Sequence, residues 1–144
     1  MARKSNKGNE AWQKLRKKNE KLYLKCPLSF SRNIENILSG SDFNVFPFLY
    51  YNELIESLRR SPENNRGNIV IYHFTETFGS RGEHETKRIV TDIKHYIPRS
   101  TIIGLYRNNP LASQLLIPNG VSDALEYSTN PRSNFATSLR NLLF

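Results

Sequence analysis

One run of residues near the middle of the chain limits the possible folds more than any other feature. Residues 67–74 (Gly-Asn-Ile-Val-Ile-Tyr-His-Phe) form the longest tight run of β-branched and aromatic side chains. Turn-forming residues stand on both sides of this run, as they do around a strand. A buried helix segment would also be apolar on all sides, but this run is short and rich in β-branched residues. We therefore predict the central strand of a parallel sheet that is covered by helices on both faces.

Composition limits the class of protein. The chain has 144 residues, 38% of them hydrophobic, which is enough for one domain with a real core. No apolar run approaches the about 20 residues that a membrane span needs, and no hydrophobic stretch follows the basic N-terminus as it would in a secretory signal. Cys26 is the only cysteine, which excludes an internal disulfide and a thiolate zinc cluster. These features predict a cytoplasmic protein.

The positive charge is concentrated at the N-terminus. Residues 1–25 carry a net charge of +7 and the remainder +1, which together give the +8 of the whole chain. We predict a partly helical basic arm over residues 1–20 and a folded domain over residues 21–144. The cations of this region that could bind nucleic acid or an acidic partner are Lys14, Arg16, Lys17, Lys18 and Lys21. The equal alternative is a solvated extension with Trp12 packed against the domain.

Hydrophobic periodicity predicts five strands that alternate with five helices. The predicted strands are residues 22–26, 44–49, 67–74, 101–106 and 123–127. The predicted helices begin at Ser31, Asn52, about Glu83, Pro110 and Asn130, and the last one buries Phe135, Leu139 and Leu142. Pro47 cannot donate a hydrogen bond to a sheet, so its strand should lie at an edge. The result is a doubly wound α/β sandwich with a parallel sheet in the order 2-1-3-4-5, as in flavodoxin-like folds.

Several segments resemble the receiver domains of two-component response regulators. They are Phe43–Val45 leading into Leu54–Leu58, Asn68–His73, Gly120–Leu125 and Asn130-Pro131. The resemblance covers roughly residues 21–144 and implies a receiver-like fold. It also implies which residues should carry the chemistry: two carboxylates for Mg²⁺ after the first strand, an aspartate after the third, a Thr or Ser after the fourth, and a Lys before the last helix.

The sequence departs from that pattern at all four places. Lys25-Cys26 stands in place of the carboxylates, and His73, Tyr106 and Tyr127 stand in place of the aspartate, the hydroxyl residue and the lysine. Mg²⁺-dependent phosphoryl chemistry needs the metal, and the metal needs its carboxylates. The resemblance therefore implies a degenerate pseudo-receiver that is not an enzyme and holds neither metal nor cofactor.

The predicted function is regulation through binding to another protein of a signalling pathway, with a homodimer as one form of it. The candidate contact residues are Tyr106, Tyr127, His73 and Arg107. The two tyrosines either fill the pocket that metal and phosphate would occupy or supply rigid contact area to a partner. A nucleic-acid-binding regulator that uses the basic arm is the alternative function.

Other candidate chemistry is weaker. His84 and His95 lie on a predicted helix apart from His73, so the three histidines are not expected to share a metal. Gly79–Gly82 is predicted as a flexible loop, and it lacks the Lys-Ser/Thr of a P-loop. Glu76, Glu83 and Glu85 are interpreted as solvated carboxylates. A flavodoxin-like enzyme is a third possibility, although the loop over residues 27–31 is a poor match to a flavin site.

Overall fold

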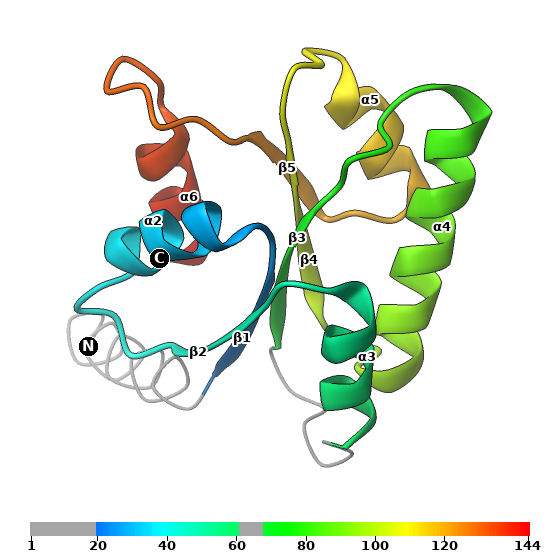
Figure 1. The fold of residues 1–144 in the computed structure, drawn as a ribbon, viewed down its shortest axis with the longest axis horizontal. Helices are drawn as coiled ribbons and strands as arrows, with labels where there is room; N and C mark the ends of the chain where they lie inside the picture. The colour runs from blue at the N-terminus through cyan, green and yellow to red at the C-terminus, as the bar shows by residue number, and fades with distance from the viewer. Residues whose placement is uncertain (1–19, 61–67) are drawn as a thin grey trace, which may run out of the picture.

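A computed structural model describes residues 20–60 and 68–144 of the chain. It contains a five-stranded parallel sheet in the order β2-β1-β3-β4-β5 (Figure 1). The strands are β1 (Lys21–Lys25), β2 (Asn44–Phe48), β3 (Ile69–His73), β4 (Thr101–Tyr106) and β5 (Asp123–Glu126). The predicted strand order and fold class are confirmed. Pro47 lies on the edge strand β2, where it pairs with Leu24, and β3 lies in the middle of the sheet.

Helices cover both faces of the sheet (Figure 1). They are α2 (Leu28–Ile37), α3 (Tyr51–Arg59), α4 (Gly79–Tyr96), α5 (Ala112–Leu116) and α6 (Phe135–Leu143), with a short 3-10 helix, η1 (Ile117–Asn119), after α5. One hydrophobic core lies between the sheet and α2 with α6, and the other lies between the sheet and α3, α4 and α5. None of the helices in the described ranges is long and apolar enough to cross a membrane.

The alternation of side chains along the strands explains the two cores. In β1, Leu22 and Leu24 join the α2/α6 core, whereas Tyr23 joins the opposite one. In β3, Ile71 and Val70 divide in the same way. Successive residues of a strand point to opposite faces, so a strand that is apolar at every position serves both cores. This is the property that identified the central strand in the sequence.

The predicted start of α2 at Ser31 is wrong, because the helix begins at Leu28. The backbone N–H groups of Phe30 and Ser31 donate to the carbonyl oxygen of Pro27, both at 3.0 Å. Ser31 is buried and its hydroxyl lies 3.5 Å from the Cys26 sulfur, so it does not cap the helix. Pro27 ends the connection from β1, and the helix begins directly after it, before the predicted start at Ser31. This earlier start places Phe30 on the helix.

Two other helix starts also differ from the prediction. Asn52 does not cap α3: the Glu53 carboxylate accepts the backbone N–H of Tyr50 at 3.2 Å, which makes Tyr50 the N-cap. Helix α4 begins at Gly79, so the glycine-rich segment is its first turn and not a loop. A Cβ on Gly82 would meet the Glu76 carbonyl oxygen at 3.0 Å. Glycine is therefore required there for close packing of helix and loop.

The C-terminal half shows similar corrections. Asn130 does not cap α6; its side-chain oxygen accepts the N–H of Arg132 at 2.9 Å and closes a separate turn. The last helix begins only at Phe135. Leu143 is 5% exposed and faces the core, whereas Leu142 is 40% exposed, so the predicted core position was one residue early. Pro110 likewise precedes α5, which begins at Ala112.

The predicted basic arm lies almost entirely outside the described residues. Of its candidate contact residues, Lys14, Arg16, Lys17 and Lys18 fall in that part, and the division into arm and domain stays a prediction. Lys21 is described: it begins β1, and its ammonium group lies 5.8 Å from the centre of the Phe46 ring.

Candidate functional site at the carboxyl edge of the sheet

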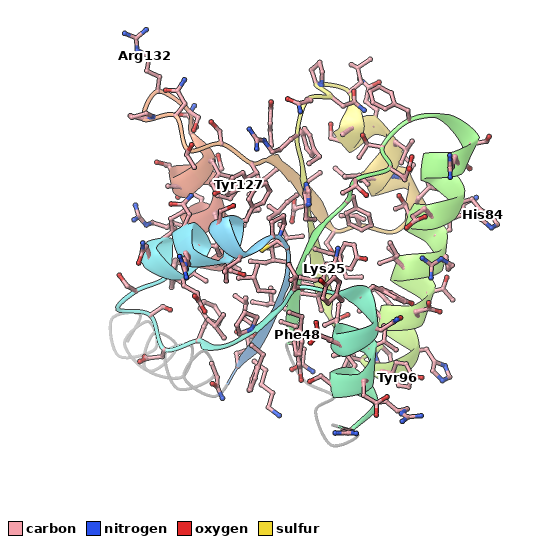
Figure 2. All side chains as sticks on the ribbon, in the orientation of Figure 1. Lys25, Phe48, His84, Tyr96, Tyr127 and Arg132 are labelled. Atoms are coloured by element: carbon pink, nitrogen blue, oxygen red, sulfur yellow. The ribbon has the colours of Figure 1, made fainter. Side chains whose placement is uncertain are left out.

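The carboxyl ends of the five parallel strands meet at one edge, where open α/β sheets bind their ligands. Lys25 ends β1, His73 ends β3, and Arg107 and Tyr127 directly follow β4 and β5. The fold therefore brings the predicted contact residues His73, Arg107, Tyr106 and Tyr127 to the same edge. Figure 2 shows Lys25 and Tyr127 in the central part of the molecule, with His84 on the outer side of α4.

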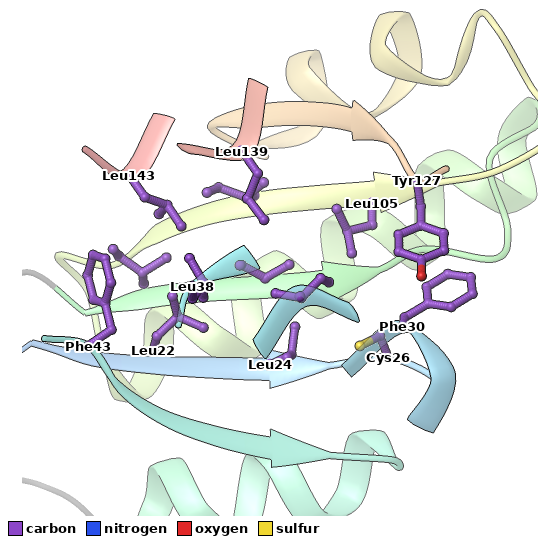
Figure 3. Close-up of a cluster of buried hydrophobic side chains, with 14 of the residues drawn as sticks. Leu22, Leu24, Cys26, Phe30, Leu38, Phe43, Leu105, Tyr127, Leu139 and Leu143 are labelled. Carbon is purple, nitrogen blue, oxygen red and sulfur yellow. The ribbon is translucent and has the colours of Figure 1, made fainter. Parts of the chain in front are cut away.

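Tyr127 belongs to a buried aromatic cluster. It is 5% exposed, and its ring stacks on Phe30 with centroids 3.7 Å apart and an interplanar angle of 11°. Phe135 packs edge-on against Tyr127 at 5.0 Å, and Asn33 donates a hydrogen bond to the tyrosine hydroxyl at 3.3 Å. Figure 3 shows Phe30 and Tyr127 beside each other, next to Cys26. We call Phe30, Tyr127 and Phe135 the aromatic cluster.

Tyr106 is also buried, at 8% exposure, and it belongs to the core under α3, α4 and α5. Burial and the nearby Glu126 raise the pKa of its phenol, so it stays neutral at physiological pH. The burial of both tyrosines supports the alternative in which they fill the pocket that metal and phosphate would need. It leaves little of either ring for contact with a partner.

His73 and Arg107 lie above the aromatic cluster. The His73 imidazole packs edge-on against Phe30 at 4.9 Å, and the Arg107 guanidinium carbon lies 5.7 Å from the centre of the same ring. His73 is half-buried and Arg107 is exposed. Among the described residues, no hydrogen bond is made to either ring nitrogen of His73.

Lys25 approaches from the other face of the sheet. Its ammonium group lies 4.8 Å from the centre of the Tyr72 ring, and Tyr72 pairs with Lys25 across the two central strands. Lys25 and Arg107 both lower the pKa of His73. We call Lys25, His73 and Arg107 the cationic centre.

The electrostatics of this centre follow from its burial. Burial first, and then Lys25 and Arg107, lower the pKa of His73 to about 4. Burial also lowers the pKa of Lys25, while Cys26 and Glu85 act in the opposite direction. At neutral pH the imidazole is therefore uncharged and carries one N–H and one lone pair.

The ion pairs found among the described residues lie elsewhere. They link Glu56 to Arg59 and Arg60 on α3, and they link Lys87, Arg88 and their acidic neighbours along α4. Neither Lys25 nor Arg107 has a carboxylate within ion-pair distance in residues 20–60 and 68–144. The charges of Lys25 and Arg107 are therefore screened by solvent and by the faces of aromatic rings, and not by a carboxylate of the described residues.

The residues at this edge do not fit the Mg²⁺ that a receiver would need. Magnesium takes hard oxygen ligands, mostly carboxylates and water, and the corresponding positions here are Lys25, Cys26 and His73. Within the described ranges no group of three or more His, Cys, Asp or Glu residues could hold a metal ion. Cys26 is buried, and burial raises the pKa of its thiol, so it is not a thiolate ligand either.

The remaining candidates lie apart from the cationic centre. His84 and His95 are both exposed on α4, and His95 packs edge-on against Tyr96 at 4.8 Å. Glu83 and Glu85 pair with Lys87 and Arg88 on the surface of the same helix.

Exposed apolar side chains also lie at this edge, and the sequence patterns did not identify them. They follow the first four strands at the same edge, and each is at least 60% exposed: Leu28, Tyr50, Phe78 and Leu111. Phe78 and Leu111 line an open groove of about 760 Å³ between α4 and α5. We call these four side chains the apolar rim. Their position in connections between apolar strands and amphipathic helices was a signal that could have identified them.

A buried asparagine holds two of these connections together. Asn109 is 4% exposed, and its amide donates to the backbone oxygen and the hydroxyl of Thr77, both at 3.1 Å. Its side-chain oxygen accepts the N–H of Leu111 at 3.1 Å. The loop that carries Phe78 is therefore fixed to the loop that carries Leu111, which gives the rim a defined shape.

Comparison with known proteins shows which fold this is. No protein-family model and no curated protein sequence matches the chain. Among solved structures, the signal receiver domain of a protein described as a Luxo repressor, from Vibrio parahaemolyticus, is 17% identical, with a TM-score of 0.58 over 86% of this chain and 85% of that one. A CheY-like protein (tadZ) from Pseudomonas aeruginosa is 16% identical, with a TM-score of 0.53 over 87% and 98%.

A third solved structure, described as a pilus assembly protein (cpaE) from Burkholderia thailandensis, is 11% identical, with a TM-score of 0.53 over 85% of this chain and 95% of that one. Identities this low say nothing about shared chemistry, but the agreement extends over most of each chain and over the order of the strands. The chain has the fold of receiver domains.

Proposed function

We propose that this chain is a receiver-like regulatory module that binds another protein through the carboxyl edge of its sheet and is not switched by aspartyl phosphorylation. The observation that carries the proposal is the edge itself. Lys25 and Cys26 stand where the resemblance requires the metal-binding carboxylates, and a neutral His73 stands where it requires the aspartate. Arg107 and exposed apolar side chains lie at the same edge. A surface of this kind favours association over phosphoryl transfer.

The apolar rim supplies the area of the proposed interface. Phe78 and Tyr50 are 67% and 64% exposed, and large side chains of this type are typical anchors at protein interfaces. Arg107 adds a planar donor group that is also common in such anchors. Tyr106 and Tyr127 contribute indirectly. Their buried rings stabilise the strand ends and connections that carry His73 and Arg107.

The proposal is tested with two arginines that flank the same strand. Arg107 follows β4 at the carboxyl edge and Arg99 precedes it at the opposite edge, and both are exposed. Immobilised wild-type chain, Arg107→Gln, Phe78→Ser and Arg99→Gln are exposed to extract of the native host, and retained proteins are identified by mass spectrometry. A partner at this edge is retained by wild type and Arg99→Gln and lost from the other two.

The same partner is then purified and its affinity measured for each variant. Loss of a central anchor is expected to weaken binding by about thirtyfold, or about 2 kcal/mol. Equal affinity of all four chains would contradict the proposed location. A second copy of the chain is one form of partner, and sedimentation of the same variants shows whether self-association follows the same order.

The charge of residues 1–25 favours a second candidate function, binding to nucleic acid. Nine of the 21 basic residues lie in that segment, and phosphate binding by such an arm depends steeply on salt. The test compares DNA and RNA binding at several salt concentrations for the full chain and for a chain without residues 1–19. The truncation stops there because the backbone oxygen of Glu20 accepts the N–H of Asn44 at 3.1 Å. Binding that does not change on truncation would exclude the arm.

A further inference from the structure

We propose that the N-terminal arm, residues 1–19, docks its two large apolar side chains, Trp12 and Leu15, on the edge of the sheet beside β2 of the same chain. The docking surface belongs to the domain, and the docked segment lies outside the described ranges. This docking does not depend on the function proposed above.

Within the described ranges, helical cover of the α2/α6 face stops between β1 and β2, at the edge of the sheet (Figure 1). Leu22 and Leu24 of β1 are 0% exposed. Their register partners on β2, Val45 and Pro47, are half-buried and exposed. Val45 packs at the margin of the α2/α6 core, and Pro47 shares its face because alternate side chains of a strand point the same way. Leu49 follows the strand and is 49% exposed. We call Val45, Pro47 and Leu49 the edge strip.

The backbone of β2 is a poor template for another strand. The N–H of Asn44 donates to the carbonyl oxygen of Glu20 at 3.1 Å, so the polar groups of Asn44 point to β1. The three residues of the edge strip alternate with those that pair with β1, so their backbone groups point outward. Pro47, in the middle of the strip, has no N–H to donate. A strand from a second copy would lack this central hydrogen bond, whereas a helix packs through its side chains and can cover such an edge.

The arm joins the domain beside the edge strip. Glu20 is the first described residue, and its backbone bonds to the start of β2. Leu15 stands five residues before Glu20, a distance that an extended chain spans with up to about 17 Å. Trp12 and Leu15 share one face of the helix predicted for the arm, about 4.5 Å apart along its axis. Val45 and Pro47 are about 6.6 Å apart along the strand, so both apolar side chains of the arm can reach the strip.

Two carboxylates border the edge strip. Asp42 is exposed and lies two residues before β2. Glu35 is exposed on α2. Asn33 of the same helix donates to the Tyr127 hydroxyl, on the flank that faces β5 and α6. Two residues along a helix are about 200° apart, so Glu35 lies on the opposite flank, towards β2.

The charge of the arm complements these carboxylates. Residues 1–19 contain seven Lys and Arg residues against Glu10, a net charge of +6. Within the described ranges, neither Glu35 nor Asp42 forms an ion pair. An arm with apolar side chains on one face and cations beside them fits an apolar strip with carboxylates at its border. The same cations could bind nucleic acid, so docking and nucleic-acid binding would compete for them.

The experiment uses the fluorescence of Trp12 in the full chain, because Trp12 is the only tryptophan. We expect its emission to lie at shorter wavelength than in the same chain unfolded in urea, and to be less readily quenched by acrylamide. Both properties should be independent of protein concentration, since the arm docks on its own domain. Emission and quenching equal to those of the unfolded chain would overturn the proposal. Burial of Trp12 that grows with protein concentration would also overturn it, because the arm would then bind a second copy.

A matched pair of variants locates the docked arm. Pro47→Lys places a positive charge on the edge strip, and Asn52→Lys places the same charge on α3, on the other face of the sheet; both positions are exposed. We expect Pro47→Lys to move the Trp12 emission towards that of the unfolded chain and Asn52→Lys to leave it unchanged. Circular dichroism verifies that each variant is folded. An equal response of the two variants would overturn the proposed location.

A second pair tests the charges. Glu35→Gln is expected to weaken docking by about twofold to fivefold at low salt, as for an exposed ion pair, and to have no effect at high salt. Glu126→Gln, at the opposite edge of the sheet, should behave as wild type. Equal effects of Glu35→Gln and Glu126→Gln would reject the role of the carboxylates at the strip.

Backbone NMR of the full chain gives a test that leaves the domain unchanged. Trp12→Ala should shift the amide signals of Val45 and Leu49, and it should leave the signal of Leu125 on β5 in place. If Trp12→Ala shifts none of these signals, the arm does not contact the edge strip.

Discussion

The aromatic cluster and the cationic centre occupy the same edge of the sheet but differ in what they contact. Phe30, Tyr127 and Phe135 are almost completely buried and touch one another. His73 and Arg107 lie against Phe30 of this cluster, whereas Lys25 lies over Tyr72 on the other face of the sheet. All three are partly or fully open to solvent. We propose that the cluster fills the volume that a metal and a phosphoryl group would need, and that the centre sets the charge that a partner meets. One edge is thus divided into a stabilising layer and a contact layer.

The largest effect is expected for Tyr127→Ala, which removes the middle of the aromatic cluster. By analogy with buried phenylalanine, the cavity should lower the free energy of unfolding by about 3–5 kcal/mol, as measured by urea denaturation. The matched control is Tyr50→Ala, in which a 64% exposed tyrosine is truncated and a change below about 0.5 kcal/mol is expected. Similar losses for the two variants would mean that the two layers are not distinct.

A smaller effect is expected from the pH dependence of stability. The pKa of His73 is lowered in the folded state, to about 4 from 6.5, so the unfolded chain binds its proton first as the pH falls. The contribution of neutral His73 is complete above about pH 6.5 and is lost as the pH falls from there towards 4. After allowance for its partial exposure, the loss is on the order of 1–2 kcal/mol.

The check is denaturation of wild type and His73→Gln across this range. The variant should lack this part of the pH dependence, because glutamine does not titrate. An identical slope in both chains would show that other groups cause the loss of stability.

Arg107→Gln should change stability least among the edge variants. The guanidinium is exposed, and its carbon lies 5.7 Å from the centre of the Phe30 ring, so the free energy of unfolding should change by less than about 0.5 kcal/mol. Its melting temperature should equal that of Arg99→Gln. A marked loss of stability in Arg107→Gln alone would assign this arginine to the stabilising layer.

Removal of residues 1–19 tests whether a third region contributes to folding. Trp12 and Leu15 are the large apolar side chains that this segment offers to the domain. We expect the melting temperature to fall by less than about 8 °C, which would correspond to about 2–4 kcal/mol for a domain of this size. A larger fall would show that Trp12 is part of the core.

The sheet could be predicted from the sequence because its evidence is local. Residues 67–74 are apolar at every position, and Pro47 is compatible only with an edge strand. The starts of the helices could not be predicted so well, because interactions at a distance along the chain set them. The Glu53 carboxylate reaches back to Tyr50, and Gly82 packs against the backbone of the preceding loop.

The place of part of the candidate site could be predicted, because His73 and Arg107 lie at the carboxyl ends of strands, where open α/β sheets bind ligands. Their role in binding a partner stays a prediction. Phe30, which connects them, was missed because the helix was predicted to open after it. The spacing of Phe30, Ile34 and Leu38 at i, i+4 and i+8 contained this information.

Intact-mass measurement after treatment with acetyl phosphate and Mg²⁺ tests the central claim most directly, with a phosphorylatable receiver domain treated in parallel. In this chain, we propose, a receiver fold carries aromatic packing and positive charge where carboxylates would bind the metal. We therefore expect that the mass of this chain does not change while the control domain gains a phosphoryl group. A stoichiometric, Mg²⁺-dependent phosphoryl adduct on residues 20–144 of this chain, at His73 or elsewhere at the carboxyl edge, would contradict it.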